Sequence, residues 1–157
     1  MIGICRRHSS ALVTIDFSTD SRWLRSGCEA GQLHFFNASS GQHQSNTSAL
    51  KDLRWATESC LLAYGSAGAQ SQTVVDAAIL TACGRARVDY DEDSGPEAGG
   101  GIVCTADSYG RVRLQNFPSR PDSTYLEWRG HAGRIAQVAF NSDDTHLLTI
   151  GSNDRCI

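Results

Sequence analysis

The chain has 157 residues, 40% of them hydrophobic and 20% charged, which is typical of a globular protein that buries a core. Its net charge of −3 at pH 7 argues against a nucleic-acid-binding protein, because such proteins usually carry a basic face. No apolar run approaches the ~20 residues that cross a bilayer and no secretory signal is present, so we expect a soluble, cytoplasmic protein with no membrane partner.

The six cysteines are widely scattered and form no Cys-x-x-Cys pair, which argues against structural zinc and favours reduced thiols. The histidines are likewise not grouped at metal-ligand spacing. The glycines at 99–101 are followed by no Gly-Lys-Ser/Thr, so they do not form a phosphate-binding loop. We therefore expect no metal, no cofactor and no small-molecule substrate.

The first predicted hairpin begins near residue 13. Apolar and polar residues alternate over 13–17, the pattern of a strand that buries one apolar face. Residues 18–21 are rich in turn formers, and a second strand follows at Trp23. A third strand is predicted over residues 32–36.

A second group of strands is predicted in the middle of the chain. Residues 102–114 read as a hairpin, and 125–128 as an outer strand. Residues 73–83 are interpreted as the inner strand, although their apolar run is also compatible with a short helix. The acidic, Gly- and Pro-containing stretch 89–101 predicts a disordered insertion.

The segment that begins at His131 repeats the segment that begins at His8 without a gap. The matching pairs are Phe17 and Phe140, Asp20 and Asp143, Leu24 and Leu147, Ser26 and Thr149. The second copy has only begun its third strand, at 155–157, when the chain ends. The separation of the two copies fits three repeats of about 40–45 residues, or two repeats with insertions.

These residues carry a resemblance to a known family. Gly130-His131, Ser142-Asp143, Leu147-Leu148-Thr149, Gly151-Ser152 and Asp154 resemble the WD-repeat signature. His8-Ser9-Ser10, Lys51 to Thr57, Asp76-Ala77-Ala78, Thr105 to Val112 and Phe117-Pro118 look like the C-terminal propeller of the echinoderm microtubule-associated protein-like family. The Gly-Val-Trp-Pro segment of that family is absent, and residues 64–73 are instead small and polar.

The resemblance implies an all-β fold, a partial WD-repeat β-propeller that spans residues 1–157. About two and a half to three blades of antiparallel strands are expected, which cannot close a ring. We therefore expect a fragment of a larger propeller, which is prone to aggregate when expressed alone. Trp55 and Trp128 are expected to pack between blades.

The resemblance also implies a structural hydrogen-bond network. In WD blades the Gly-His histidine is buried and bonds to a turn aspartate and a strand hydroxyl, roles that fall here to His131, Asp154 and Thr149. In the first copy His8 and Ser26 persist, but Ala30 stands at the aspartate position and Phe36 at that of the Trp. That network is expected to be weaker, with Glu29 as a partial substitute or His8 simply solvated.

The implied function is a non-catalytic scaffold that binds tubulin, microtubules or another cytoskeletal protein, in the cytoplasm, the cytoskeleton or a cilium. The alternatives are a generic WD-repeat adaptor, of the ciliary-transport or ubiquitin-ligase type, and a hydrolase built on a propeller. No nucleophile elbow, metal motif or carboxylate pair supports an enzyme. Candidate partner-binding residues lie on predicted loops: Arg22, Tyr109, Arg111 and Asp144.

Overall fold

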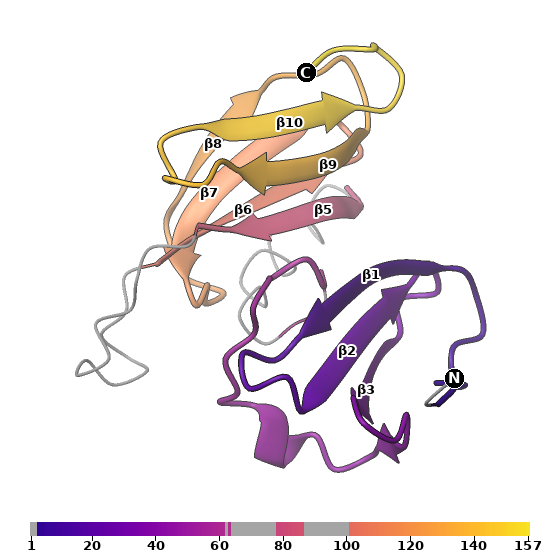
Figure 1. Cartoon of the computed structure of the whole chain (residues 1–157). Helices are drawn as coiled ribbons and strands as arrows, with labels where there is room; N and C mark the ends of the chain where they lie inside the picture. The colour runs from indigo at the N-terminus through magenta and orange to yellow at the C-terminus, as the bar shows by residue number, and fades with distance from the viewer. Residues whose placement is uncertain (1–2, 62, 64–77, 87–100) are drawn as a thin grey trace. The chain divides into compact units, whose positions relative to one another are not determined.

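The computed structural model describes residues 3–61, 63, 78–86 and 101–157. The chain divides into two compact units, Met1–Ala63 and Tyr64–Ile157, and each is built from antiparallel strands (Figure 1). The all-β class predicted from the sequence is therefore confirmed. Within the described part of the chain, no helix has the length and apolarity that a membrane crossing requires.

The first unit is one four-stranded sheet in the order β1-β2-β3-β4, followed by a short 3-10 helix, η1. The bounds are β1 Leu12–Phe17, β2 Trp23–Cys28, β3 Leu33–Asn37, β4 His43–Gln44 and η1 Ser48–Leu50. The strands follow one another as a meander, because each connection is a short turn. We call this sheet the first module.

The second unit contains a second four-stranded meander, β5-β6-β7-β8, and a two-stranded hairpin, β9-β10. The bounds are β5 Leu80–Arg85, β6 Gly101–Asp107, β7 Arg111–Phe117, β8 Tyr125–Arg129, β9 Ile135–Phe140 and β10 Leu147–Gly151. We call these the second and third modules. The third module contains two strands, and residues 155–157, expected to begin a third strand, are not in a strand.

The first two strands of all three modules form the same ladder. Each ladder has a register shift after the first residue pair of its first strand. The shift lies between Leu12 and Thr14 in the first module and between Leu80 and Ala82 in the second. In the third module it lies between Ile135 and Gln137, which pair with Gly151 and Ile150. The pairs Ile15–Ser26, Cys83–Thr105 and Val138–Thr149 then occupy equivalent places. Because such bulges are retained features of a fold, the shared ladder shows that the chain is built from repeats of one module. The copies at His8 and His131 are two modules apart.

The middle repeat is obscured in the sequence by its long connection. Strands β1 and β2 are joined by residues 18–22, and β9 and β10 by 141–146, whereas β5 and β6 are joined by 86–100. Most of the expected insertion, 89–100, lies outside the described residues, and Gly101 is the first residue of β6. The part of 73–83 that the structure describes enters a strand at Leu80, which is β5.

The core of the second unit lies between the second and third modules. Residues on one face of β5, β6 and β7 pack against residues of β9 and β10. Figure 1 shows β9 beside β5. The buried members are Ala82, Cys104, Ala106, Val112, Ile135 and Val138. Trp128, expected to pack between blades, instead is 51% exposed on β8.

The first module buries the face of β1 opposite to the one predicted from its alternation. Ile15 and Phe17 are exposed, whereas Asp16 between them is buried. Trp55 covers this buried face together with Phe35 and other apolar side chains of its own unit. The prediction was wrong because alternation defines two faces of a strand without fixing which face is covered.

Candidate functional site

His131 lies at the end of the third module, in the connection between β8 and β9. Its Nδ1 is 2.8 Å from Oδ2 of Asp154 and its Nε2 is 2.8 Å from Oγ1 of Thr149. Asp154 also accepts hydrogen bonds from the backbone N–H groups of Ala132 and Cys156. The Cys156 N–H and His131 lower the pKa of Asp154. The network thus fastens the segment after β10 to the segment before β9.

The order carboxylate, imidazole, hydroxyl also occurs in hydrolytic triads, but the surroundings differ from those of a catalytic site. The His131 side chain is only 4% exposed, and Thr149 lies in the middle of β10. A nucleophile must be reachable by a substrate and must face oxyanion donors. A buried imidazole with both nitrogens hydrogen-bonded is instead what a structural network requires.

The first module contains half of the same network. His8 Nε2 lies 2.7 Å from Oγ of Ser26, which corresponds to the contact between His131 and Thr149. Ala30 precedes Gly31, whose φ is +71°, just as Asp154 precedes Arg155, whose φ is +57°. Ala30 therefore occupies the position of the carboxylate.

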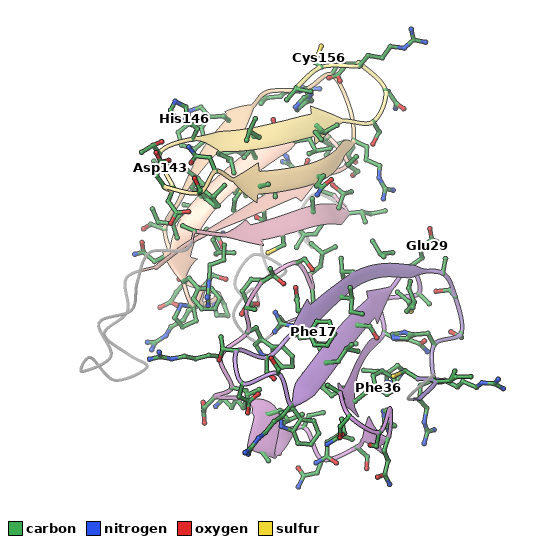
Figure 2. All side chains as sticks on the ribbon, viewed as in Figure 1. Phe17, Glu29, Phe36, Asp143, His146 and Cys156 are labelled. Atoms are coloured by element: carbon green, nitrogen blue, oxygen red, sulfur yellow. The ribbon has the colours of Figure 1, made fainter. Side chains whose placement is uncertain are left out.

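The missing carboxylate leaves a polar atom without a partner. His8 Nδ1 is buried and has no hydrogen-bond partner among the described residues. Glu29, considered as a substitute from the sequence, is exposed at the turn after β2 (Figure 2). His8 is therefore neither fully solvated nor fully paired.

Three histidines gather on the face of the first module that carries Phe36, and no pattern in the sequence indicates this cluster. The rings of His8 and His34 are 4.7 Å apart, and Nδ1 of His34 is 3.3 Å from Nε2 of His43. All three rings lie around Phe36. The reason is register: β3 pairs with β4, which brings His43 beside Phe36 and next to His34.

The histidine cluster resists protonation. Desolvation lowers the pKa of His8; desolvation and then neighbouring positive groups, Arg7 among them, lower the pKa values of His34 and His43. Among the residues that the structure describes, no three His, Cys, Asp or Glu side chains are placed to hold a metal ion.

A buried ion cluster lies on the opposite face of the first module. Arg25 on β2 donates from Nε to Oδ2 of Asp16 on β1 at 2.9 Å, and its other end contacts Glu58. The guanidinium also lies over the Trp55 ring, 4.3 Å from its centroid. All three charged side chains are at most 5% exposed. Such a cluster is favourable only when its members are paired.

Asp16 connects β1 to the segment that follows η1. Its Oδ1 accepts from Oγ1 of Thr57 and from both N–H and Oγ of Ser59, while Oδ2 accepts from N–H of Cys60. Burial alone raises the pKa of Asp16, but Arg25 and these donors hold it below the ordinary value. Burial and the Asp16 carboxylate raise the pKa of the Cys60 thiol to about 12.

The repeated aspartates Asp20 and Asp143 shape equivalent loops. Asp20 accepts the backbone N–H of Arg22, and Asp143 accepts that of Thr145. Each is followed closely by a residue with φ near +57°, Ser21 or Asp144. A carboxylate that bonds two residues ahead stabilises such a turn. These loops are therefore preorganised at one end of the modules.

The candidate partner-binding residues of the second unit lie at opposite ends of its modules. Within the second unit, Asp144 lies between β9 and β10, at the end of that hairpin opposite to Cys156, as its neighbours Asp143 and His146 show in Figure 2. Tyr109 and Arg111 belong to the β6–β7 turn, which hydrogen-bonds to the His131 segment at the other end of the modules. Arg22 is in the first unit, with a side chain 80% exposed.

Tyr109 and Arg111 are held by the β6–β7 turn. Asp107 Oδ1 accepts the backbone N–H groups of both residues, and its Oδ2 pairs with Nε of Arg111 at 2.7 Å. The Arg111 guanidinium lies 5.4 Å from the Tyr109 ring centroid. The exposed tyrosine is thus presented on a rigid support, which favours it over Arg111 as a contact residue.

Comparison with known proteins agrees with these repeated antiparallel modules. The family model of the echinoderm microtubule-associated protein second beta-propeller matches residues 1–157. The chain belongs to this propeller family. The modules are accordingly blades, two of them with four strands and the third with two.

Relatives of this family member are found across distant organisms. It is 28% identical to the 77 kDa echinoderm microtubule-associated protein of Lytechinus variegatus, over 98% of the chain and 21% of that protein. It is 26% identical to a ciliary WD repeat-containing protein of Euplotoides octocarinatus, over 99% of the chain and 20% of the relative. Human echinoderm microtubule-associated protein-like 2 is also 26% identical, over 99% and 22%. The chain therefore spans about a fifth of these relatives.

Proposed function

We propose that this propeller segment is a non-catalytic scaffold that binds microtubules or tubulin. The observation that carries the proposal is the family match over the whole chain, with relatives named as microtubule-associated or WD-repeat proteins. One of these relatives is named as ciliary, which supports placement at the cytoskeleton or in a cilium. The buried positions of His131 and Asp16 support structural rather than catalytic roles for the polar clusters.

The proposed contacts are made by loops at the ends of blades. Rigid sheets hold such loops in fixed positions, so that side chains on them meet a partner at a small entropic cost. Arg22 is the candidate that is most exposed, and it extends from a loop ordered by Asp20. Tyr109 is a second proposed contact residue, and it is exposed on the β6–β7 turn of the second blade.

The test is co-sedimentation of the purified chain with stabilised microtubules. Pellets without microtubules are the blank, because self-association alone also produces a pellet. We expect saturable co-sedimentation that Arg22→Ala weakens several-fold. Arg129→Ala is the matched control, since it removes the same charge from an exposed position on β8. It should bind like the unmodified chain.

Absence of microtubule-dependent sedimentation would overturn the microtubule assignment. The broader role of a WD-repeat adaptor in another complex, of the ciliary-transport or ubiquitin-ligase type, would then be favoured. Equal loss of binding in Arg22→Ala and Arg129→Ala would instead show that general charge, rather than the β1–β2 loop, determines binding.

A further inference from the structure

In the network of the third blade, one carboxylate oxygen serves donors from two consecutive residues. Oδ2 of Asp154 lies 2.8 Å from Nδ1 of His131 and accepts the backbone N–H of Ala132 at 3.2 Å. Because the two donors are neighbours in the chain, they define one place where an anionic oxygen is held. We call this place the anion position of the blade end.

The first blade has the donors of the anion position without the acid. Nδ1 of His8 is buried and has no hydrogen-bond partner among the described residues. The backbone N–H of Ser9 donates to the neutral amide oxygen Oε1 of Gln32 at 3.1 Å. Ala30 stands at the carboxylate position, and its methyl group accepts no hydrogen bond. A negative group that reaches the anion position would therefore satisfy His8.

Ser9 is the residue that can supply such a group. Its own backbone N–H is one of the two donors, so its side chain starts next to the anion position. Ser9 is exposed, and its Oγ contacts Oε1 of Gln32 at 3.1 Å. The neighbouring Ser10 is already engaged, because its Oγ accepts the backbone N–H of Ala30 at 2.9 Å. A phosphate on Ser9 would bring three acceptor oxygens and a charge of about −2.

The residues before Ser9 form a recognition sequence for a protein kinase. Arg6 and Arg7 stand three and two residues before Ser9 and are the only Arg-Arg pair in the chain. Both are exposed, and neither forms an ion pair within the part of the chain that the structure describes. Kinases of the basophilic class select arginines at these two places, since carboxylates in their substrate groove pair with the guanidinium groups.

The exposure of this stretch is a property of the blade end. In the third blade, Arg129, Gly130 and Ala132 stand where the first blade has Arg6, Arg7 and Ser9, and all three are exposed. They are exposed although a complete outer strand, β8, leads directly into them. The accessibility of the first copy therefore does not depend on which residues precede it.

We propose that Ser9 is a phosphorylation site for a basophilic serine kinase and that its phosphate takes the place of the missing carboxylate beside His8. The kinase transfers the γ-phosphoryl group of ATP. A bond forms between Oγ of Ser9 and the γ-phosphorus, the bond from that phosphorus to the β–γ bridging oxygen breaks, ADP leaves, and the hydroxyl proton is released.

The phosphate then completes the network of the first blade. One of its oxygens accepts from Nδ1 of His8 and from the backbone N–H of Ser9, as Asp154 does in the third blade. The charged acceptor replaces the neutral amide of Gln32, which is partly exposed and turns to water. Modification thus fastens the segment before β1 to the blade end. The inference rests on the fold and is independent of microtubule binding.

The first test is phosphorylation of the folded chain by the catalytic subunit of cyclic-AMP-dependent protein kinase with ATP. Fragmentation mass spectrometry should place one phosphate on Ser9, and Ser9→Ala should abolish it. The double variant Arg6→Ala, Arg7→Ala should be modified at least about tenfold more slowly. Arg134→Ala is the matched control, because it removes an exposed arginine from the second unit, and it should be modified at the rate of the unmodified chain.

The second test asks where the phosphate acts. Phosphorylation should lower the equilibrium constant for unfolding of the first unit about tenfold, as measured by urea denaturation with circular dichroism. The gain should vanish in His8→Phe, which keeps the arginines but removes the donor. It should also vanish in Ala30→Asp, where a carboxylate already fills the anion position and repels the phosphate. If His8→Phe fails to fold, Ala30→Asp alone decides.

Three results would overturn the proposal. The first is a folded chain that acquires no phosphate, or acquires it only on Ser10. The second is a phosphorylated chain whose unfolding midpoint is unchanged or lower. The third is an equal gain in the unmodified chain, in His8→Phe and in Ala30→Asp, because the phosphate would then act through Arg6 and Arg7 rather than through His8.

Discussion

At the scale of single residues, the stability of a blade end depends on whether the histidine before the first strand of the blade has a hydrogen-bond partner at each ring nitrogen. His131 finds both, Asp154 and Thr149, whereas His8 finds only Ser26. An unpaired polar atom inside a protein costs more than an ordinary hydrogen bond contributes, because its lost hydration is not replaced. We therefore expect that removing a partner of His131 lowers stability and that adding a partner to His8 raises it.

Replacing Thr149 with Val should destabilise the second unit. The change keeps the shape of the side chain but leaves Nε2 of His131 without a partner, which should cost about 1–3 kcal/mol of unfolding free energy. Urea denaturation followed by circular dichroism measures the loss. Thr124→Val, at an exposed position before β8, is the control and should unfold like the unmodified chain.

Replacing Ala30 with Asp should stabilise the first unit. A carboxylate at this position can accept a hydrogen bond from Nδ1 of His8, as Asp154 does from His131, and should contribute about 1–2 kcal/mol. The gain should vanish in a His8→Phe background, which a double-mutant cycle measures. An equal gain with and without His8 would mean that the turn itself, not the network, is responsible.

At the scale of elements, the two faces of the first sheet carry different polar clusters with different roles. The ion cluster fastens the segment after η1 to β1 and β2, because one carboxylate collects donors from both. The histidine cluster gathers β3, β4 and the N-terminal segment around Phe36. One cluster pairs opposite charges, whereas in the other burial lowers the pKa values of the three histidines.

Asp16→Asn should loosen the attachment of the segment that contains Thr57 to Cys60. Neutralising one member of a buried, fully hydrogen-bonded ion cluster should cost about 3 kcal/mol or more. Limited proteolysis within this segment and thermal denaturation report the effect. Asp52→Asn removes a charge from an exposed position of the same unit and should leave both readouts unchanged.

The histidine cluster should make the first unit less stable in acid. The pKa values of His8, His34 and His43 in the folded chain are below their ordinary value, so the unfolded chain binds protons first as the pH falls. Their contribution is complete above the unfolded pKa of about 6.5 and is lost progressively below it. The nearby Arg7 adds to the repulsion that protonated His34 and His43 experience.

Urea midpoints measured between about pH 7.5 and pH 5 would show this loss. The double variant His34→Gln, His43→Gln should flatten the pH dependence. His146→Gln, in the exposed β9–β10 loop, should leave it unchanged. A midpoint that rises as the pH falls below 6.5 would contradict the prediction.

At the scale of the whole molecule, the chain is a series of blades whose connections differ in length while their ladders do not. The first hairpin, the β5–β6 hairpin and the β9–β10 hairpin share one register although 86–100 is far longer than 18–22. A ladder that is independent of its connection must be determined by the strands and by the faces that they bury.

Deleting residues 89–98 should therefore leave the fold intact. Shortening a long connection changes the entropy of closing it by only about 1 kcal/mol. The thermal midpoint and the far-UV circular dichroism spectrum should change little. Deletion of 142–144, which removes the turn built on Asp143, is the control and should strongly destabilise the β9–β10 hairpin. Equal damage by both deletions would show that the long connection contributes to packing.

The sequence by itself determined the repeat, the all-β class and the family. Each copy must form the same strand and the same turn, so Phe17 recurs as Phe140 and Asp20 as Asp143. Such local requirements are recognisable because they depend on residues close together in the sequence. His131, Thr149 and Asp154 were likewise identifiable, because they belong to a signature with fixed spacing. The long connection hid the middle repeat.

Only the tertiary structure decided which face of each strand is covered. The alternation around Asp16 predicts a strand with Ile15 buried. The buried face is instead that of Asp16, because Thr57 and Ser59, from far along the chain, donate hydrogen bonds to its carboxylate. The histidine cluster arises in the same way, from the pairing of β3 with β4. Burial is a property of the partner that covers a face, and that partner is not encoded in the strand itself.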